Sequence, residues 1–342
     1  MGDSRHEWMQ PGAYPVAPGV HRIPLPLPND GLRAVNVYAV ADGDALTLID
    51  GGWALEESRD QLSTALRQIG AGLGDINRFL VTHAHRDHYT QAVALRREFG
   101  AKVLLGEDER YTIRVLMAPD HRSLDKQIEL LDECGAKPVR DAVVAAREQG
   151  GRRSSHVWEE PDEWIGNAAD LSLADRPLRA LATPGHTRGH LVFIDDANDL
   201  MFAGDHVLPH ITPSIGFEQA PSEVPLRDYL ASLRLVRTLP DMRLLPAHGP
   251  VTESVHQRVD ELLDHHDARL AATAEVVGRG ASTAYEAARA LTWTRRERTL
   301  DELDPFNQMM AVLETAAHLD VLSLQGKLGK AEIEGVVHYA LA

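Results

Sequence analysis

Residues 82–88 constrain this chain more than any other stretch, because three histidines and one aspartate fall within seven positions. They directly follow three apolar residues, which predict a short buried strand. In an extended backbone alternate side chains point the same way, so His83 and His85 should share one side. Asp87 and His88 follow where the chain turns, and they can face the same point. Imidazoles and a carboxylate suit zinc, so the stretch predicts a metal site at a strand end.

Three more residues of the kinds that bind metals follow short apolar stretches further along the chain. They lie in the sequences Thr-Pro-Gly-His, Phe-Ala-Gly-Asp and Pro-Ala-His-Gly, which supply His186, Asp205 and His248. Each apolar stretch predicts a strand. Four predicted strand ends therefore deliver seven candidate ligands.

This set of motifs, in this order, resembles the metallo-β-lactamase-fold hydrolases over roughly residues 18 to 255. The resemblance implies an α/β fold, an αββα sandwich, and it is nearest to the hydroxyacylglutathione hydrolase-like branch. The C-terminal part is mostly helical by periodicity and ends in a turn and a short strand. It resembles the winged-helix domain that some of these hydrolases carry, including an endoribonuclease branch.

The chain is expected to divide into an arm, a catalytic domain and a C-terminal domain. Residues 1–19 are polar and rich in Pro and Gly, residues 20–255 form the catalytic domain, and residues 256–342 form the helical, winged-helix-like domain. Residues 107–166 interrupt the strand–helix rhythm. They are interpreted as an insertion that covers the site as a lid, or alternatively as a solvated surface excursion.

The resemblance assigns the seven candidate ligands to two metal ions, most simply Zn²⁺, with Mn²⁺ or Fe²⁺ as alternatives. The two sets are His83, His85 and His186, and Asp87, His88 and His248. Asp205 would bridge both ions, a feature that the antibiotic-hydrolysing β-lactamases of this fold lack. A hydroxide bridging the ions would attack the substrate. Asp87 would act as the catalytic residue that orients this nucleophile and accepts its proton.

Several polar residues near the motifs have more than one interpretation. Asp50 precedes two glycines and could orient a ligand histidine or simply form a turn. Tyr89 could donate a hydrogen bond to a developing oxyanion or only pack behind the site. His190 and His206 are interpreted as packing residues, and His210 as a residue that could meet substrate.

The composition is that of a globular protein and carries a formal net charge of −16. A single cysteine, Cys134, rules out a disulfide within the chain and allows a reducing compartment. The first residues have no apolar signal core, and no run approaches the ~18 apolar residues of a membrane span. A cytoplasmic enzyme with no membrane contact is expected, and it could form a homodimer.

Three kinds of substrate remain open from the sequence. The acidic charge and the insertion favour a small-molecule ester or thioester. A phosphodiesterase or endoribonuclease acting on single-stranded nucleic acid is the alternative, supported by the winged-helix resemblance and by the basic residues 295–298 beside Trp293. Such a cluster is more often a solvated helix face, so nucleic acid is not favoured as a partner. A lactonase is the third alternative.

Overall fold

The computed structural model describes residues 4–28, 31–122, 124–149, 158–174 and 176–342. The other positions include residues 1–3 of the predicted arm and residues 123 and 150–157 of the predicted insertion. Those parts of the two predictions lie outside the described residues. Among the described residues, no helix combines the length and the apolar character that crossing a bilayer requires.

The first sheet contains seven strands in sequence order. An antiparallel meander leads into a parallel half, so the carboxyl ends of the later strands meet at one edge. The strands are β1 (Tyr14–Ala17), β2 (Val20–Pro26), β3 (Ala34–Asp42), β4 (Ala45–Ile49), β5 (Ile76–Val81), β6 (Lys102–Gly106) and β7 (Glu163–Ile165).

The second sheet contains five strands in the order β12-β11-β10-β9-β8. All its neighbours are antiparallel except β11 and β12, which run parallel and end side by side. The strands are β8 (Ala168–Ser172), β9 (Pro177–Ala182), β10 (Leu191–Asp195), β11 (Leu200–Gly204) and β12 (Arg243–Pro246). The strands predicted before His186, Asp205 and His248 are present as β9, β11 and β12.

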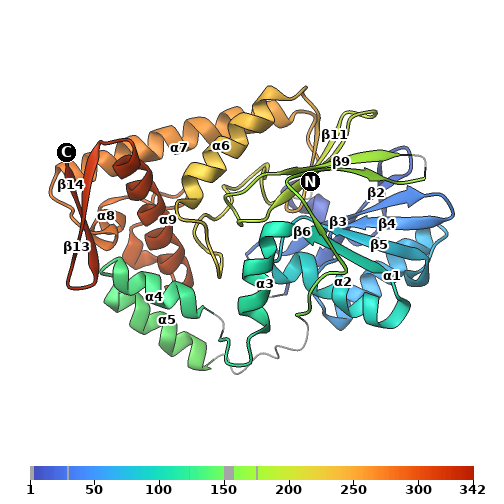
Figure 1. Ribbon diagram of the computed structural model, residues 1–342, viewed down its shortest axis with the longest axis horizontal. Helices are drawn as coiled ribbons and strands as arrows, with labels where there is room; N and C mark the ends of the chain where they lie inside the picture. The colour runs from blue at the N-terminus through green and yellow to red at the C-terminus, as the bar shows by residue number, and fades with distance from the viewer. Residues whose placement is uncertain (1–3, 29–30, 123, 150–157, 175) are drawn as a thin grey trace.

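Alternation along the strands explains the layering. On β10 and β11, Phe193 and Phe202 face the core between the two sheets, whereas Val192 and Met201 face the helices outside. Helices α1 (Glu56–Gln68) and α2 (Arg86–Phe99) cover the first sheet, and α6 (Pro225–Thr238) and α7 (Val255–Gly278) cover the second (Figure 1). The predicted αββα sandwich is therefore confirmed.

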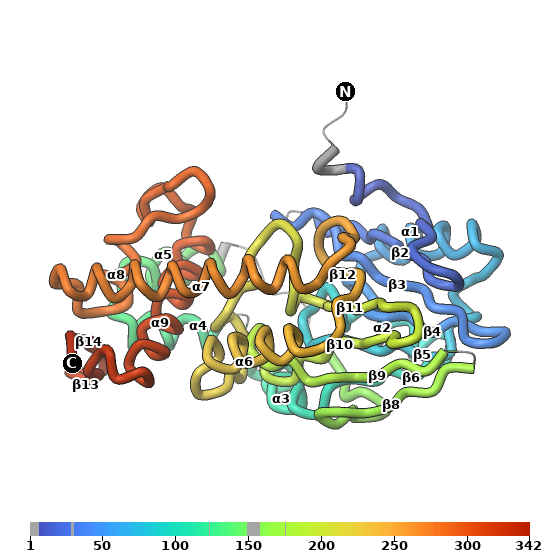
Figure 2. Tube along the Cα trace, turned by 90° about the horizontal axis from the view of Figure 1, so that it is seen from above, coloured from blue at the N-terminus to red at the C-terminus, as the bar shows by residue number. Residues whose placement is uncertain are grey.

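A mostly helical region follows the sandwich. Helix α7 runs from the sandwich into this region, as Figure 2 shows, and α8 (Ala284–Ala290), α9 (Pro305–Leu324) and a hairpin of β13 (Leu328–Ile333) and β14 (Val336–Leu341) complete it. Helices followed by a turn and one strand were predicted here; the structure has the helices and a hairpin of two strands, and the winged-helix resemblance stays a prediction. Short 3₁₀ helices lie at η1 (Ser4–Met9), η2 (Leu73–Asp75), η3 (Glu107–Glu109) and η4 (Leu300–Glu302).

The predicted insertion contains three further helices, α3 (Arg110–Met117), α4 (Asp125–Glu133) and α5 (Lys137–Gln149). Helices α4 and α5 pack against α9 and share its apolar core, which also contains Cys134 (Figure 1). Much of this segment therefore joins the C-terminal helices. That it acts as a lid stays a prediction.

Candidate metal centre

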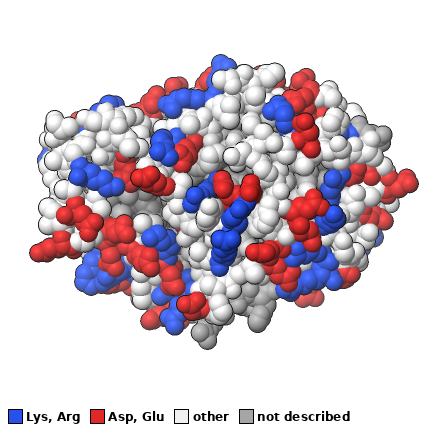
Figure 3. Space-filling model, viewed as in Figure 1, with Lys and Arg blue, Asp and Glu red and all other residues white. Residues whose placement is uncertain are grey.

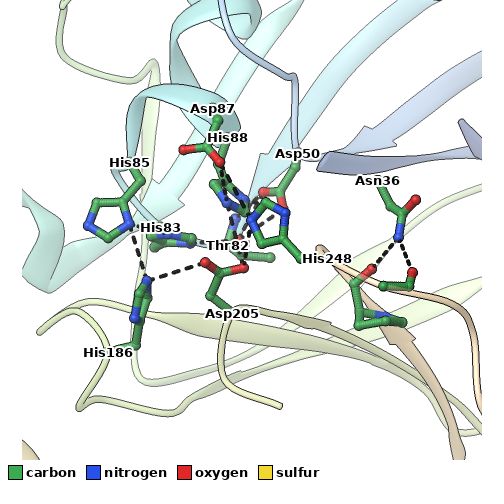
Figure 4. A network of polar contacts seen from close by, with 12 residues as sticks. Asn36, Asp50, Thr82, His83, His85, Asp87, His88, His186, Asp205 and His248 are labelled. Atoms are coloured by element: carbon green, nitrogen blue, oxygen red, sulfur yellow. Dashed lines mark hydrogen bonds and ion pairs between the residues drawn. The ribbon is translucent and has the colours of Figure 1, made fainter. Parts of the chain in front are cut away.

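The seven candidate ligands all lie in loops or first helical turns that follow strands of the sandwich. His83 and His85 follow β5, and Asp87 and His88 begin α2. The remaining three follow β9, β11 and β12, namely His186, Asp205 and His248. Figure 4 shows these side chains converging from the facing edges of the two sheets.

The first group of potential metal donors comprises His83, His85, His186 and Asp205. Nδ1 of His85 lies 2.9 Å from Nε2 of His83 and 3.2 Å from Nε2 of His186. Two nitrogens bound to one tetrahedral ion at ~2.0–2.1 Å would stand about 3.3 Å apart. The three imidazoles are therefore already spaced to surround one cation.

The second group comprises Asp87, His88 and His248. Oδ2 of Asp87 lies 3.6 Å from Nε2 of His88 and 3.5 Å from Nε2 of His248. Among the described residues, these two Nε2 atoms are buried and have no hydrogen-bond partner, and the same holds for Oδ1 of Asp205. Buried polar atoms are rarely left without a partner, so the group fits a metal ion.

Asp205 faces both groups with different oxygens. Its Oδ2 lies 3.5 Å from Nε2 of His186, on the side of the first group. Its Oδ1 lies 3.4 Å from Nε2 of His248 and 3.7 Å from Nε2 of His88, on the side of the second (Figure 4). This is the placement that a carboxylate shared between two cations requires.

The second ring nitrogen of four of the histidines meets a fixed oxygen. Nδ1 of His186 lies 2.8 Å from the carbonyl of Ser214, and Nδ1 of His248 lies 2.8 Å from the carbonyl of Ala34. These contacts make Nδ1 the donor and leave Nε2 free to bind a metal. Nδ1 of His83 and of His88 are held in the same way by Thr82 and Asp50.

Burial and neighbouring charges shift the histidine pKa values in opposite directions in the two donor groups. Burial, followed by the neighbouring imidazoles, lowers the pKa of His83 well below its ordinary value, and the same causes lower the pKa of His85 to about 3. Burial also lowers the pKa of His88, but Asp50 and the site carboxylates outweigh it and raise that pKa to about 10. The carboxylates thus create a site that attracts positive charge.

A family model described as the metallo-beta-lactamase superfamily matches residues 30–248. The chain belongs to this superfamily. It is similar to the probable metallo-hydrolase YqjP of Bacillus subtilis (strain 168), with 27% identity over 320 residues, which cover 89% of this chain and 91% of that protein. A crystal structure of a metallo-beta-lactamase family protein from Thermus thermophilus matches with a TM-score of 0.79 and 28% identity, and the match covers 96% of this chain and 100% of that chain.

One curated relative carries a named activity. It is an atrochrysone carboxyl ACP thioesterase of Aspergillus fumigatus, to which this superfamily member is 26% identical over 233 residues. The match covers 68% of this chain and 42% of that protein. Together with the donor groups, membership of the superfamily supports a hydrolase with a metal site.

Asp50 occupies the position that a residue orienting a ligand requires. Its Oδ2 lies 2.9 Å from Nδ1 of His88, and its Oδ1 accepts the backbone N–H of Thr82 at 2.8 Å. Its backbone has a φ of 62°, in the left-handed region that non-glycine residues seldom adopt. This aspartate therefore links the end of β4 to both halves of the histidine motif, and it is not a plain turn residue.

Gly204 allows Asp205 to come close to the first sheet. It has a φ of 50°, and a Cβ at this position would lie 2.7 Å from Nε2 of His190 and 2.8 Å from Cβ of Thr82. Only glycine fits such a close approach without movement of its neighbours. His190 lies behind the donors, stacked 5.1 Å from the ring of His83, as its predicted packing role requires.

Two buried glutamates support the site and were missed by sequence reasoning. Glu109 accepts a hydrogen bond from the hydroxyl of Thr187, next to His186. Glu218 accepts the backbone N–H of Arg188 at 2.8 Å. Burial raises the pKa of both carboxyl groups, to about 7 for Glu109, and the nearby Glu109 raises that of Glu218 further. No local motif marks them, because they lie on separate segments far from the histidine motif.

The structure places three further residues that the sequence singled out. The Tyr89 hydroxyl donates to the carbonyl of Glu159 at 2.8 Å, and its ring stacks on Trp158, so it packs behind the site and the oxyanion role was wrong. His206 is fully buried, as expected of a packing residue. His210 is exposed beside Gly249, where it remains a predicted substrate contact.

Proposed function

We propose that this protein is a dinuclear metal-dependent hydrolase that cleaves a small ester or thioester. The observation that carries the proposal is the position of Asp205, whose two carboxylate oxygens face two separate donor groups. A mononuclear site would need only one of these groups. The full set of seven donors also argues against a binding module that merely kept the fold.

His83, His85 and His186 would hold one ion, Asp87, His88 and His248 would hold the other, and Asp205 would bind both. Zn²⁺ suits this mixture of imidazoles and carboxylates, and Mn²⁺ or Fe²⁺ are the alternatives. When bound, such ions polarise a carbonyl oxygen and make water a better nucleophile at neutral pH. The protein's own contribution is to fix the donors and their orientation before substrate arrives.

Asp87 is the residue proposed to handle the proton. Burial would raise its pKa, but the neighbouring His88 and His248 outweigh this effect and lower it, so the carboxylate is ionised at neutral pH. Its side chain is partly exposed, unlike that of His88. It can therefore accept a hydrogen bond from an attacking water and take its proton as the carbonyl is attacked.

An ester or thioester is favoured over nucleic acid by several observations. The relative with a named activity is a thioesterase. Trp293, which could have stacked on a base, is buried and donates its ring N–H to the carbonyl of Ala288. Arg295 of the basic cluster binds the carbonyl of His210. On the face drawn in Figure 3, basic side chains are interspersed with acidic ones rather than gathered together.

The proposal is tested by removing metal from the protein, reloading it with Zn²⁺ or Mn²⁺, and assaying a panel of substrates. The panel contains acyl thioesters, esters, lactones, phosphodiesters and single-stranded RNA. We expect the highest kcat/KM on thioesters or esters, and loss of that activity with a chelator. Preferential cleavage of RNA, with binding that weakens steeply as salt rises, would support the nuclease alternative instead. Preference for lactones would support the third alternative.

A further inference from the structure

The segment after the bridging aspartate passes along both donor groups. In this site loop, defined as residues 208–217, the carbonyl of Ser214 binds His186 and the ring of Phe217 lies 6.2 Å from that of His85. His210 lies near Gly249, beside the second group. The loop therefore lies beside the donors, where a bound substrate can contact it.

The site loop is held in place by residues outside the sandwich core. Arg258 of α7 donates from Nε to the carbonyl of Leu208 at 2.6 Å and from Nη2 to that of Ile211 at 3.0 Å. Gln127 of the inserted helix α4 donates to the carbonyl of Phe217 at 2.9 Å. These backbone contacts fix where Phe217 stands relative to His85.

Phe306, in the first turn of α9, extends this aromatic surface. Its ring centre lies 5.5 Å from that of Phe217, and the two planes cross at 79°. Phe306 is 46% exposed, whereas His85 and Phe217 are partly buried. A single exposed aromatic residue is ordinary, but a line of rings that starts at a candidate metal ligand and ends in solvent is a surface that a substrate can cover.

We propose that Phe217 and Phe306 bind the apolar acyl group of the substrate beside the metal centre. The C-terminal helical region then sets which acyl groups are accepted, although it contributes none of the seven donors. This inference rests on the proposed function, because it assumes that an acyl compound occupies the site. It adds the substrate class: an acyl group longer than acetyl, with no charge along its first several carbons.

The test compares acetyl, butanoyl and octanoyl thioesters of one small thiol with the wild type and Phe306→Ala. We expect the wild type to prefer octanoyl, and Phe306→Ala to lose about tenfold in kcat/KM on octanoyl through KM, because removing apolar contact costs binding. Turnover of acetyl should change less than about twofold. Phe306→Leu should recover most of the loss. The matched control is Phe99→Ala, because Phe99 is 40% exposed at the far end of α2.

A binding experiment separates this inference from the proposed function. Non-hydrolysable methyl and octyl thioethers of the same thiol are titrated into metal-loaded protein by calorimetry. Tighter binding of the octyl compound, weakened about tenfold in Phe306→Ala and unchanged in Phe99→Ala, supports the inference even if no thioester is turned over. Equal affinity of the two compounds, or an octyl affinity unaffected by Phe306→Ala, overturns it. Failure of the wild type to hydrolyse any thioester or ester counts against the proposed function alone.

Discussion

The sandwich and the C-terminal helical region contribute to the site in different ways. All seven candidate donors follow strands of the sandwich, where parallel strands bring their carboxyl ends to common edges. Helix α7, which joins the two regions, contacts the site loop through Arg258, and the C-terminal region extends the aromatic surface with Phe306. We infer that the sandwich supplies the metal donors and that the C-terminal region influences which substrate binds. Substitutions in the two regions should therefore have different effects on metal content and on kinetics.

The largest effect is expected for Asp205→Asn in the sandwich. Loss of one charged oxygen should leave one donor group incomplete, because both oxygens of Asp205 face donors. Activity should fall at least ~10³-fold, or about 4 kcal/mol in transition-state stabilisation. Elemental analysis should find less metal per chain than in the wild type. Wild-type activity with a full metal content would contradict the bridging role.

A smaller effect is expected for Asp50→Asn, because Asp50 is not itself a candidate donor and acts on the site by holding His88. The amide cannot stabilise charge on that imidazole, so metal affinity or activity should fall about 10–100-fold. Competition with a chelator measures the affinity, and circular dichroism checks the fold. An unchanged affinity would mean that the left-handed conformation at Asp50 serves only the turn.

The seven candidate donors could be predicted from the sequence because each lies within a few residues of the end of one of four short apolar strands. The direction of each strand then places these side chains at one edge of its sheet. The prediction therefore does not depend on contacts between distant segments. The αββα layering could be predicted for the same reason, from short apolar runs alternating with amphipathic helices. Asp50 could be singled out because two glycines mark the end of its strand.

Other parts of the site could not be predicted because they depend on contacts between distant segments. Glu109 and Glu218 meet the loop after His186 from two different elements, and neither lies in a motif. Tyr89 shows a second limit. It follows His88 in sequence, but successive helical residues point about 100° apart, so it faces Trp158 instead of the metal centre.

A third substitution tests helix α7, which joins the sandwich to the C-terminal region. Arg258→Ala removes two hydrogen bonds to the site loop. It should lower kcat/KM about three- to tenfold, the size of about 0.5–1.5 kcal/mol for one typical hydrogen bond, because Gln127 still holds the other end of the loop. Metal content should stay at the wild-type value. The matched control is Arg237→Ala, which removes an exposed ion pair with Asp260 on the outer helices. Loss of metal from the Arg258 variant would show that the two regions do not act separately.

The smallest effect concerns stability and its dependence on pH. Burial raises the pKa of Glu109 from 4.5 to about 7, so the folded state holds a proton that the unfolded state has lost. The carboxyl group therefore costs stability progressively as pH rises through this interval and costs nothing below it. Glu109→Gln cannot ionise, so its melting temperature relative to wild type should rise between about pH 4.5 and pH 7 and level off above. Glu57→Gln, an exposed site, should show no such trend.

Two metal ions are proposed to act together in one site, and stepwise metal loading can decide whether they do. Metal-free protein is titrated with Zn²⁺ or Mn²⁺, while bound metal and thioester hydrolysis are measured on the same samples. We expect the wild type to bind two equivalents per chain, with most of the activity appearing as the second is added. Asp205→Asn should bind less metal and should gain no activity at the second equivalent. Full activity after one equivalent, or hydrolysis that persists without metal, would contradict it.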